Sequence, residues 1–116
     1  MKHLKKINNK DIIITLPSKI EWSDYQKELE LVKDEKNVLN FKVPFLPKYT
    51  SIGSKCYLCY RSNIIGWMKI TGLINKNFIC STTNKKWDGN FIQRSGLFYK
   101  LDNPIPMKGF QGFKYF

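Results

Sequence analysis

Residues 55–73 read KCYLCYRSNIIGWMKITGL, and this stretch decides the fold class. Two runs rich in aromatic and β-branched residues, Cys56–Tyr60 and Ile64–Leu73, flank the short polar segment Arg61–Asn63. Such runs are typical of strands, and a short polar segment between them predicts a β-hairpin. Glycines inside the second run indicate sharp bending, as a small barrel requires.

The rest of the chain predicts one helix and several further short strands. Ser23 followed by Gln26 resembles a capping box within residues 18–36. The apolar residues that recur there at helical spacing are Trp22, Tyr25, Leu29 and Val32, with Leu31 beside them. Strands are expected at 12–16, 38–43, 78–80, 97–101 and 112–116, with a turn at 95–96. This order predicts an α+β fold: a small β-barrel of about five to seven short strands with one N-terminal covering helix.

The length of 116 residues suits a single domain, which we place at 10–116 after a flexible basic N-terminus at 1–9. No apolar run reaches the roughly 18 residues that a membrane-spanning helix needs. Polar residues follow the first lysines, where a signal peptide would be apolar. We therefore expect a cytoplasmic protein without a membrane partner.

The positive charge lies after residue 35. Residues 1–35 hold seven basic and seven acidic side chains, whereas residues 36–116 hold thirteen basic and two acidic ones, giving the net charge of +11. A field of this sign attracts polyanions and accelerates their encounter, so RNA or DNA is the expected partner. The alternative is a lysine-rich composition that serves solubility.

Several aromatic and basic side chains form a candidate nucleic-acid-binding set. Trp87 follows two lysines in a polar loop, a combination that suits base stacking beside phosphate contacts. The alternative is that the Trp87 side chain closes the end of the barrel. Trp67 is expected to share a strand face with Lys69. Its side chain either lines a groove or joins the core. The complete set is Arg61, Trp67, Lys69, Lys85, Lys86, Trp87, Arg94, Ser95, Lys108 and Gln111.

The two arginines, Arg61 and Arg94, are set among eighteen lysines, which suggests a need for their planar fork at a phosphate or base edge. Ser95 and the glycine after it are expected to form a small anion-binding nest. The alternative for Arg94 is an ion pair with Asp88 or Asp102.

The cysteines and the single histidine assign no catalytic residue, metal or cofactor. Cys56 and Cys59 form a C-x-x-C, but alternation within a strand directs them to opposite faces. His3 lies in the N-terminal segment, so a Ser–His or Cys–His arrangement would depend on it.

The central segment resembles the PUA-like superfamily, which includes PUA, ASCH and EVE domains. The resemblance covers residues 10–75 and rests on Gly53, Leu58, Ile65 and Gly66, where a glycine lets the strands pack closely. It implies a pseudo-barrel with a helix over its opening, and RNA binding or reading of a modified or flipped base. We therefore expect a nucleic-acid-binding module.

Two other functions remain open. The resemblance also implies, for some ASCH members, hydrolysis of a modified nucleoside. Such an amidohydrolase would draw on Thr82 or Thr83, Lys69 or Lys86, and Glu21, Asp24 or Asp88. The second alternative is a protein-interaction domain whose charge is incidental.

Overall fold

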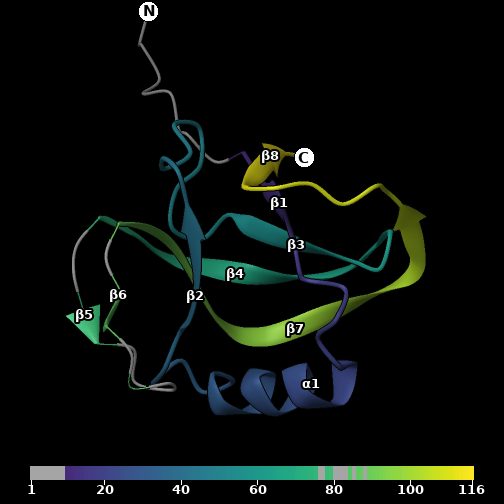
Figure 1. Ribbon diagram of the computed structural model, residues 1–116, viewed down its shortest axis with the longest axis horizontal. Coiled ribbons are helices and arrows are strands. Elements are labelled where there is room, and N and C mark those ends of the chain that lie inside the picture. Colours follow the sequence, from purple (N-terminus) through teal and green to yellow (C-terminus); the bar gives the residue numbers. More distant parts are fainter. Residues whose placement is uncertain (1–9, 76–77, 80–83, 85, 88) are drawn as a thin grey trace, which may run out of the picture.

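The computed structural model describes residues 10–75, 78–79, 84, 86–87 and 89–116, with the backbone alone at 78–79 and 86–87. Figure 1 shows a curled sheet, closed to a half-barrel, with one helix beneath it. The elements in chain order are β1 (Ile12–Thr15), α1 (Trp22–Leu31), β2 (Leu39–Val43), β3 (Lys55–Tyr60), β4 (Asn63–Asn75), β5 (Phe78–Ile79), β6 (Lys86–Trp87), β7 (Asn90–Pro106) and β8 (Phe113–Tyr115).

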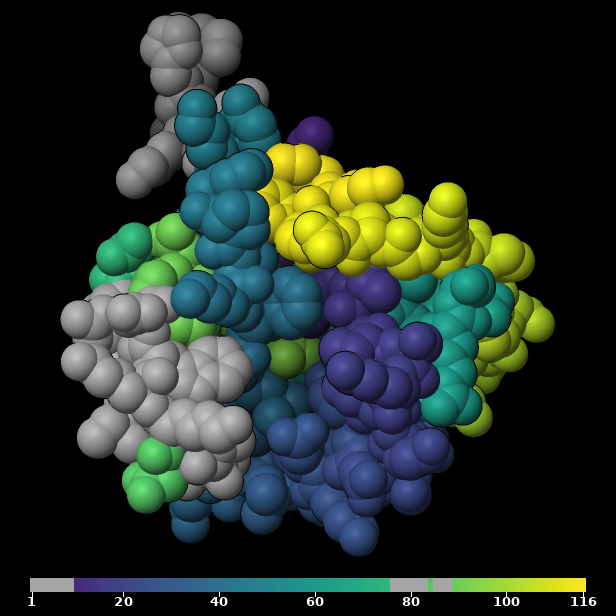
Figure 2. All heavy atoms as spheres, viewed as in Figure 1, coloured from purple at the N-terminus to yellow at the C-terminus, as the bar shows by residue number. Residues whose placement is uncertain are grey.

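Six strands form the main sheet in the order β2-β7-β4-β3-β1-β8, while β5 and β6 form a separate pair. β1 pairs with β3 in parallel, and the other neighbours in the main sheet are antiparallel. The loop after β2 and the C-terminal strand lie side by side (Figure 2), where the Phe45 and Phe113 ring centroids are 5.5 Å apart. This contact brings the two edges of the sheet toward each other.

The inner face of the sheet carries the main core. Leu58 and Met68 are fully buried there, and Tyr25 of α1 and Val32, the residue that follows α1, join them in one cluster. Burial alternates along most of β4, which separates this inner face from an outer face that carries Trp67 and Lys69. The helix therefore covers the inner face, while Met107 and Phe110 pack on Ile13 and Ile64 and cover part of the outer face.

The predicted hairpin of β3 and β4 is confirmed. Arg61 and Ser62 both have positive φ, 48° and 67°, as a two-residue type I′ connection requires. Gly66 is needed for close packing, because a Cβ at this position would lie 2.5 Å from the carbonyl oxygen of Tyr99.

Two local predictions about the helix are wrong. The helix begins at Trp22 after Glu21, which makes no side-chain capping bond, so Ser23 lies inside the first turn and caps nothing. Leu31 is 55% exposed, because it falls beside the buried stripe that Tyr25 and Val32 form.

The predicted turn at residues 95–96 is also wrong, since β7 continues through it. Gly96 has φ 89° within the strand, and its N–H donates to the carbonyl of Val32 at 2.8 Å. The glycine thus bends β7 toward the end of α1 and does not end the strand. Residues 1–9, expected to be flexible, lie outside the described part of the chain.

Among the described residues, no helix has the length and apolar character needed to cross a membrane.

Candidate functional site

Four aromatic side chains form a row across the outer face of the sheet, which we call the aromatic row: Phe116, Tyr57, Trp67 and Tyr99. Tyr57 is the cross-strand partner of Trp67, and Trp67 is that of Tyr99. The rings form two stacks, Phe116 on Tyr57 at 4.1 Å and Trp67 on Tyr99 at 4.3 Å between centroids. Phe116 is 57% exposed and Tyr99 46% exposed, so the row presents ring surface to solvent at both ends.

Lysines flank the aromatic row on the same face. The Lys55 Nζ lies 4.6 Å from the ring centroid of Trp67, and Lys55 is the cross-strand partner of Lys69. Lys114 lies opposite Ile13, which is itself the partner of Tyr57, so it shares this face. Flat rings beside cationic side chains are the combination that single-stranded nucleic acids bind.

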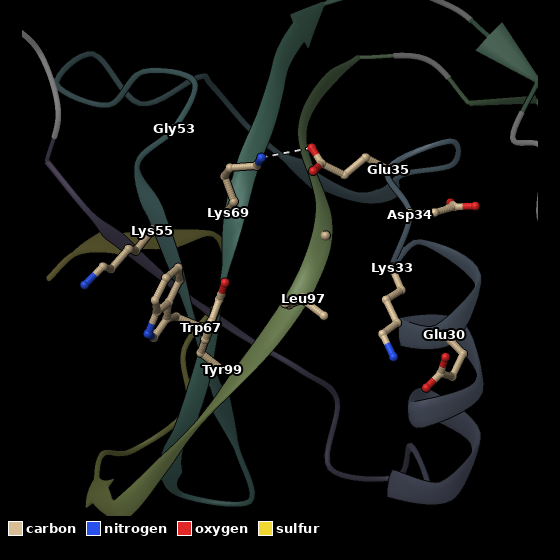
Figure 3. A pocket seen from close by; sticks show the side chains of 11 residues that line it. Glu30, Lys33, Asp34, Glu35, Gly53, Lys55, Trp67, Lys69, Leu97 and Tyr99 are labelled. Atoms are coloured by element: carbon tan, nitrogen blue, oxygen red, sulfur yellow. Dashed lines mark ion pairs between the residues drawn. The ribbon is translucent and has the colours of Figure 1, made fainter.

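A pocket of about 820 Å³ opens at one end of the aromatic row, between β4, β7 and the turn after α1. Figure 3 shows Lys69 and Glu35 pointing toward each other across it, with their charged atoms 2.9 Å apart. The side chains that line it include three lysines and three carboxylates: Lys33, Lys55, Lys69, Glu30, Asp34 and Glu35. The lining is therefore balanced in formal charge, unlike the chain as a whole.

The structure brings two of the predicted site residues together, Trp67 and Lys69, which both line this pocket. Trp67 is half-buried, so it lines a groove while its ring packs on Tyr99. Arg61 lies elsewhere, at the tip of the β3–β4 hairpin. Its Nε donates to the carbonyl of Ser18 at 3.0 Å, and its Nη2 lies 4.0 Å from Glu21.

The expectation that Arg94 and Ser95 present surface groups is wrong. Arg94 is 3% exposed, because its position in β7 places it opposite the buried Ile70, and its Nη1 donates to the Tyr25 hydroxyl at 2.8 Å. Ser95 is fully buried and its hydroxyl lies 3.1 Å from that of Thr71. The Gly96 N–H is not free to bind an anion in the predicted nest, because it donates to the carbonyl of Val32, just after α1.

The remaining candidates divide into two groups. Lys108 and Gln111 are exposed, as expected, in the segment between β7 and β8, away from the residues that line the pocket. Lys85 lies outside the described residues, and so do the side chains of Lys86 and Trp87, whose backbone forms β6.

The described residues do not bring together the side chains expected for the alternative function, hydrolysis of a modified nucleoside. Lys69 pairs with Glu35, and Glu21 lies near Arg61, so neither Glu21 nor Asp24 accompanies Lys69 in the pocket. Thr82, Thr83 and Asp88 lie outside the described part of the chain.

The two described cysteines belong to different clusters. Cys56 is buried in the main core, whereas Cys59 packs with Ile13 and Ile64 and donates its thiol hydrogen to the Met107 carbonyl. Burial raises the pKa of Cys56 to about 12, and nearby Arg94 opposes this shift. The predicted opposite orientation of the C-x-x-C side chains is thus confirmed.

Sequence reasoning missed Tyr57, Tyr99, Lys55, Glu35 and Phe116 as site residues. The alternation of the predicted hairpin already places Tyr57 and Lys55 on one face, so this signal was present. Tyr99 requires the register of β7, and Glu35 requires the position of the helix end, which no local pattern supplies.

The chain matches no family model, no curated protein and no solved structure.

Proposed function

We propose that this domain binds single-stranded nucleic acid, RNA or DNA, across the outer face of its sheet. The observation that carries the proposal is the aromatic row with its flanking lysines. Every base has a flat face, so a row of rings supplies sequence-tolerant stacking, while lysines neutralise phosphates.

The division of the charge supports this proposal over a site for a compact anion. The pocket lining pairs Lys69 with Glu35 at 2.9 Å, which reduces its attraction for a phosphate group. Lys114 and the other basic residues after position 35, apart from Lys55 and Lys69 of the pocket lining, contribute instead to the wider positive field of the chain. In the proposed complex that field draws in the strand, and the aromatic row holds a base.

The test is equilibrium binding of a fluorescein-labelled oligouridine or oligothymidine of about nine nucleotides, within the usual site size of small single-strand-binding domains. We expect Tyr99→Ala to weaken binding roughly fivefold to a hundredfold, since stacking contributes about 1–3 kcal/mol per base. Tyr49→Ala is the matched control, because Tyr49 has nearly the same exposure (47% against 46%) and packs on Tyr115 with tilted rings, outside the aromatic row.

Salt dependence provides an independent measurement. The logarithm of the binding constant should fall linearly with that of the salt concentration, and Lys55→Ala should reduce the slope by about one phosphate contact. Absence of binding at low salt, or equal effects of Tyr99→Ala and Tyr49→Ala, would overturn the proposal.

We also propose that the half-barrel is of the PUA-like type. Two features support this assignment: α1 packs on the inner face of the sheet, and Gly66 occupies a position that a side chain would block. An experimental structure in which the Phe45–Phe113 contact is absent and the sheet lies open would contradict it.

A further inference from the structure

The pocket at the end of the aromatic row joins an aromatic wall to an ion pair. The wall is the Trp67–Tyr99 stack, and Lys69 follows Trp67 by two residues on the same face of β4. Two residues of a strand span about 7 Å, which is close to the width of a nucleobase. A ring stacked on Tyr99 therefore extends its edge toward Lys69 and Glu35 (Figure 3).

Glu35 is held in a conformation that a glutamate rarely adopts. Its φ is 64°, in the left-handed region, and its N–H donates to the carbonyl of Val32 at 3.1 Å. The same carbonyl accepts the N–H of Gly96, and a Cβ on Gly96 would lie 3.7 Å from the Glu35 Cγ. The junction between α1 and β7 thus fixes the backbone from which the Glu35 side chain extends toward Lys69.

Stability alone gives a weak reason for this arrangement. The side chains of Glu35 and Lys69 are 49% and 44% exposed, and ion pairs in that setting contribute little to folding. A non-glycine residue with positive φ carries a conformational cost, and such residues cluster at functional sites. The pair is better explained by recognition of a ligand.

We propose that this pocket binds guanine, an inference that rests on the proposed single-strand binding. The Watson–Crick edge of guanine carries two adjacent donors, N1–H and N2–H₂, beside the acceptor O6. The two oxygens of the Glu35 carboxylate accept both donors, and the Lys69 ammonium donates to O6. The ring stacks on the exposed surface of Tyr99.

The other bases match the pair less well. Cytosine and adenine each present one amino donor beside a ring acceptor, and uracil presents one N–H between two carbonyls. Each leaves one Glu35 oxygen without a donor or opposes it with an acceptor. Each of these bases therefore forms at least one charge-assisted hydrogen bond fewer than guanine, and water replaces it at this half-exposed carboxylate.

The experiment compares three labelled oligouridines that carry one central guanosine, inosine or adenosine, together with unmodified oligouridine. We expect the guanosine strand to bind about tenfold or more tightly than the adenosine strand, with inosine between them because it lacks the N2 amino group. Glu35→Gln should abolish this order, and oligouridine should bind the variant at least as tightly as the parent, because Lys69 loses its ion-pair partner. Asp102→Asn removes one negative charge from an exposed position in β7 outside the pocket and should preserve the order.

The outcomes separate this inference from the proposed function. If every strand binds with equal affinity, the guanine inference is wrong and single-strand binding stands. If no strand binds, both are wrong. A parallel titration with guanosine monophosphate, followed by the fluorescence of Trp67 in a Trp22→Phe/Trp87→Phe background, identifies the source of the base: saturation supports guanine recognition as a free nucleotide. Preference retained in Glu35→Gln would overturn the assignment of the carboxylate.

Discussion

The buried contact between Arg94 and Tyr25 allows a quantitative test of how the core holds a charge. Arg94 is 3% exposed and Tyr25 4% exposed, and the guanidinium donates to the hydroxyl at 2.8 Å. Within the described part of the chain the Arg94 Nε has no hydrogen-bond partner. Burial raises the pKa of Tyr25, an effect that Arg94 partly offsets, so the hydroxyl is neutral at pH 7. The cation therefore depends on a neutral acceptor.

We predict strong coupling in a double-mutant cycle on this pair. Tyr25→Phe removes a hydrogen bond to a charged group and should reduce the free energy of unfolding by about 1.5–3 kcal/mol. Arg94→Met leaves the Tyr25 hydroxyl without this donor, which costs about 1–3 kcal/mol, while it removes the cost of a buried cation. The double variant has neither unpaired group, so its loss should be smaller than the sum of the single losses by about 1–3 kcal/mol.

Urea unfolding followed by tryptophan fluorescence measures all four proteins, since Trp22 stacks on Tyr25 with ring centroids 5.7 Å apart. The control cycle pairs Arg94→Met with Tyr60→Phe, because the Tyr60 hydroxyl donates to the backbone carbonyl of Ile20 and is independent of Arg94. In this control cycle the two single changes in the free energy of unfolding should add. Additive losses within about 0.5 kcal/mol at Arg94 and Tyr25 would refute the argument that the hydroxyl supports the charge.

Three further predictions concern stability. Gly66→Ala should destabilise by about 1–3 kcal/mol or more in urea unfolding, because its Cβ would lie 2.5 Å from the Tyr99 carbonyl oxygen. Gly109→Ala should cost less, because its Cβ would lie 3.1 Å from the Thr15 Cγ2 and a small shift relieves that contact. The Glu35→Gly variant should be more stable than Glu35→Ala by about 1 kcal/mol, since φ at this position is 64° and glycine adopts it without strain. Equal midpoints of urea unfolding for the two variants would contradict backbone strain at residue 35. Burial raises the pKa of Cys56 from 9.0 to about 12, so the folded state retains a proton that the unfolded state releases. Stability should be unaffected by this group below pH 9 and fall by roughly 1 kcal/mol per pH unit between pH 9 and 12, and Cys56→Ala should reduce that slope in unfolding measured at successive pH values.

The hairpin was predictable because its signal is local. Alternation along the run from Asn63 to Leu73 needs no knowledge of the partner strands, and it places Trp67 and Lys69 on one face correctly. The same alternation could have identified Tyr57. What the sequence could not supply was the strand that lies across from Trp67.

The error at Arg94 follows in part from the misassigned turn at residues 95–96. A serine followed by glycine is typical of a turn, and a chain that turns there would leave Arg94 at a loop end, facing solvent. In the structure Gly96 has φ 89° within an unbroken strand of 17 residues, so strand register decides the direction of Arg94. Its neighbours across β2 and β4, Leu39 and Ile70, are buried, and the guanidinium is buried with them.

The net charge and the pocket have separate parts in the proposed function. A charge of +11 acts over roughly 8 Å in physiological salt and raises the rate of encounter with any strand. The pocket, with three lysines and three carboxylates, contributes little to that long-range field and much to short-range donor and acceptor geometry. Salt dependence should respond to Lys55→Ala, which removes a positive charge beside the aromatic row, whereas base preference should respond to Glu35→Gln. Net charge governs only the encounter, so it does not identify Glu35 as a site residue.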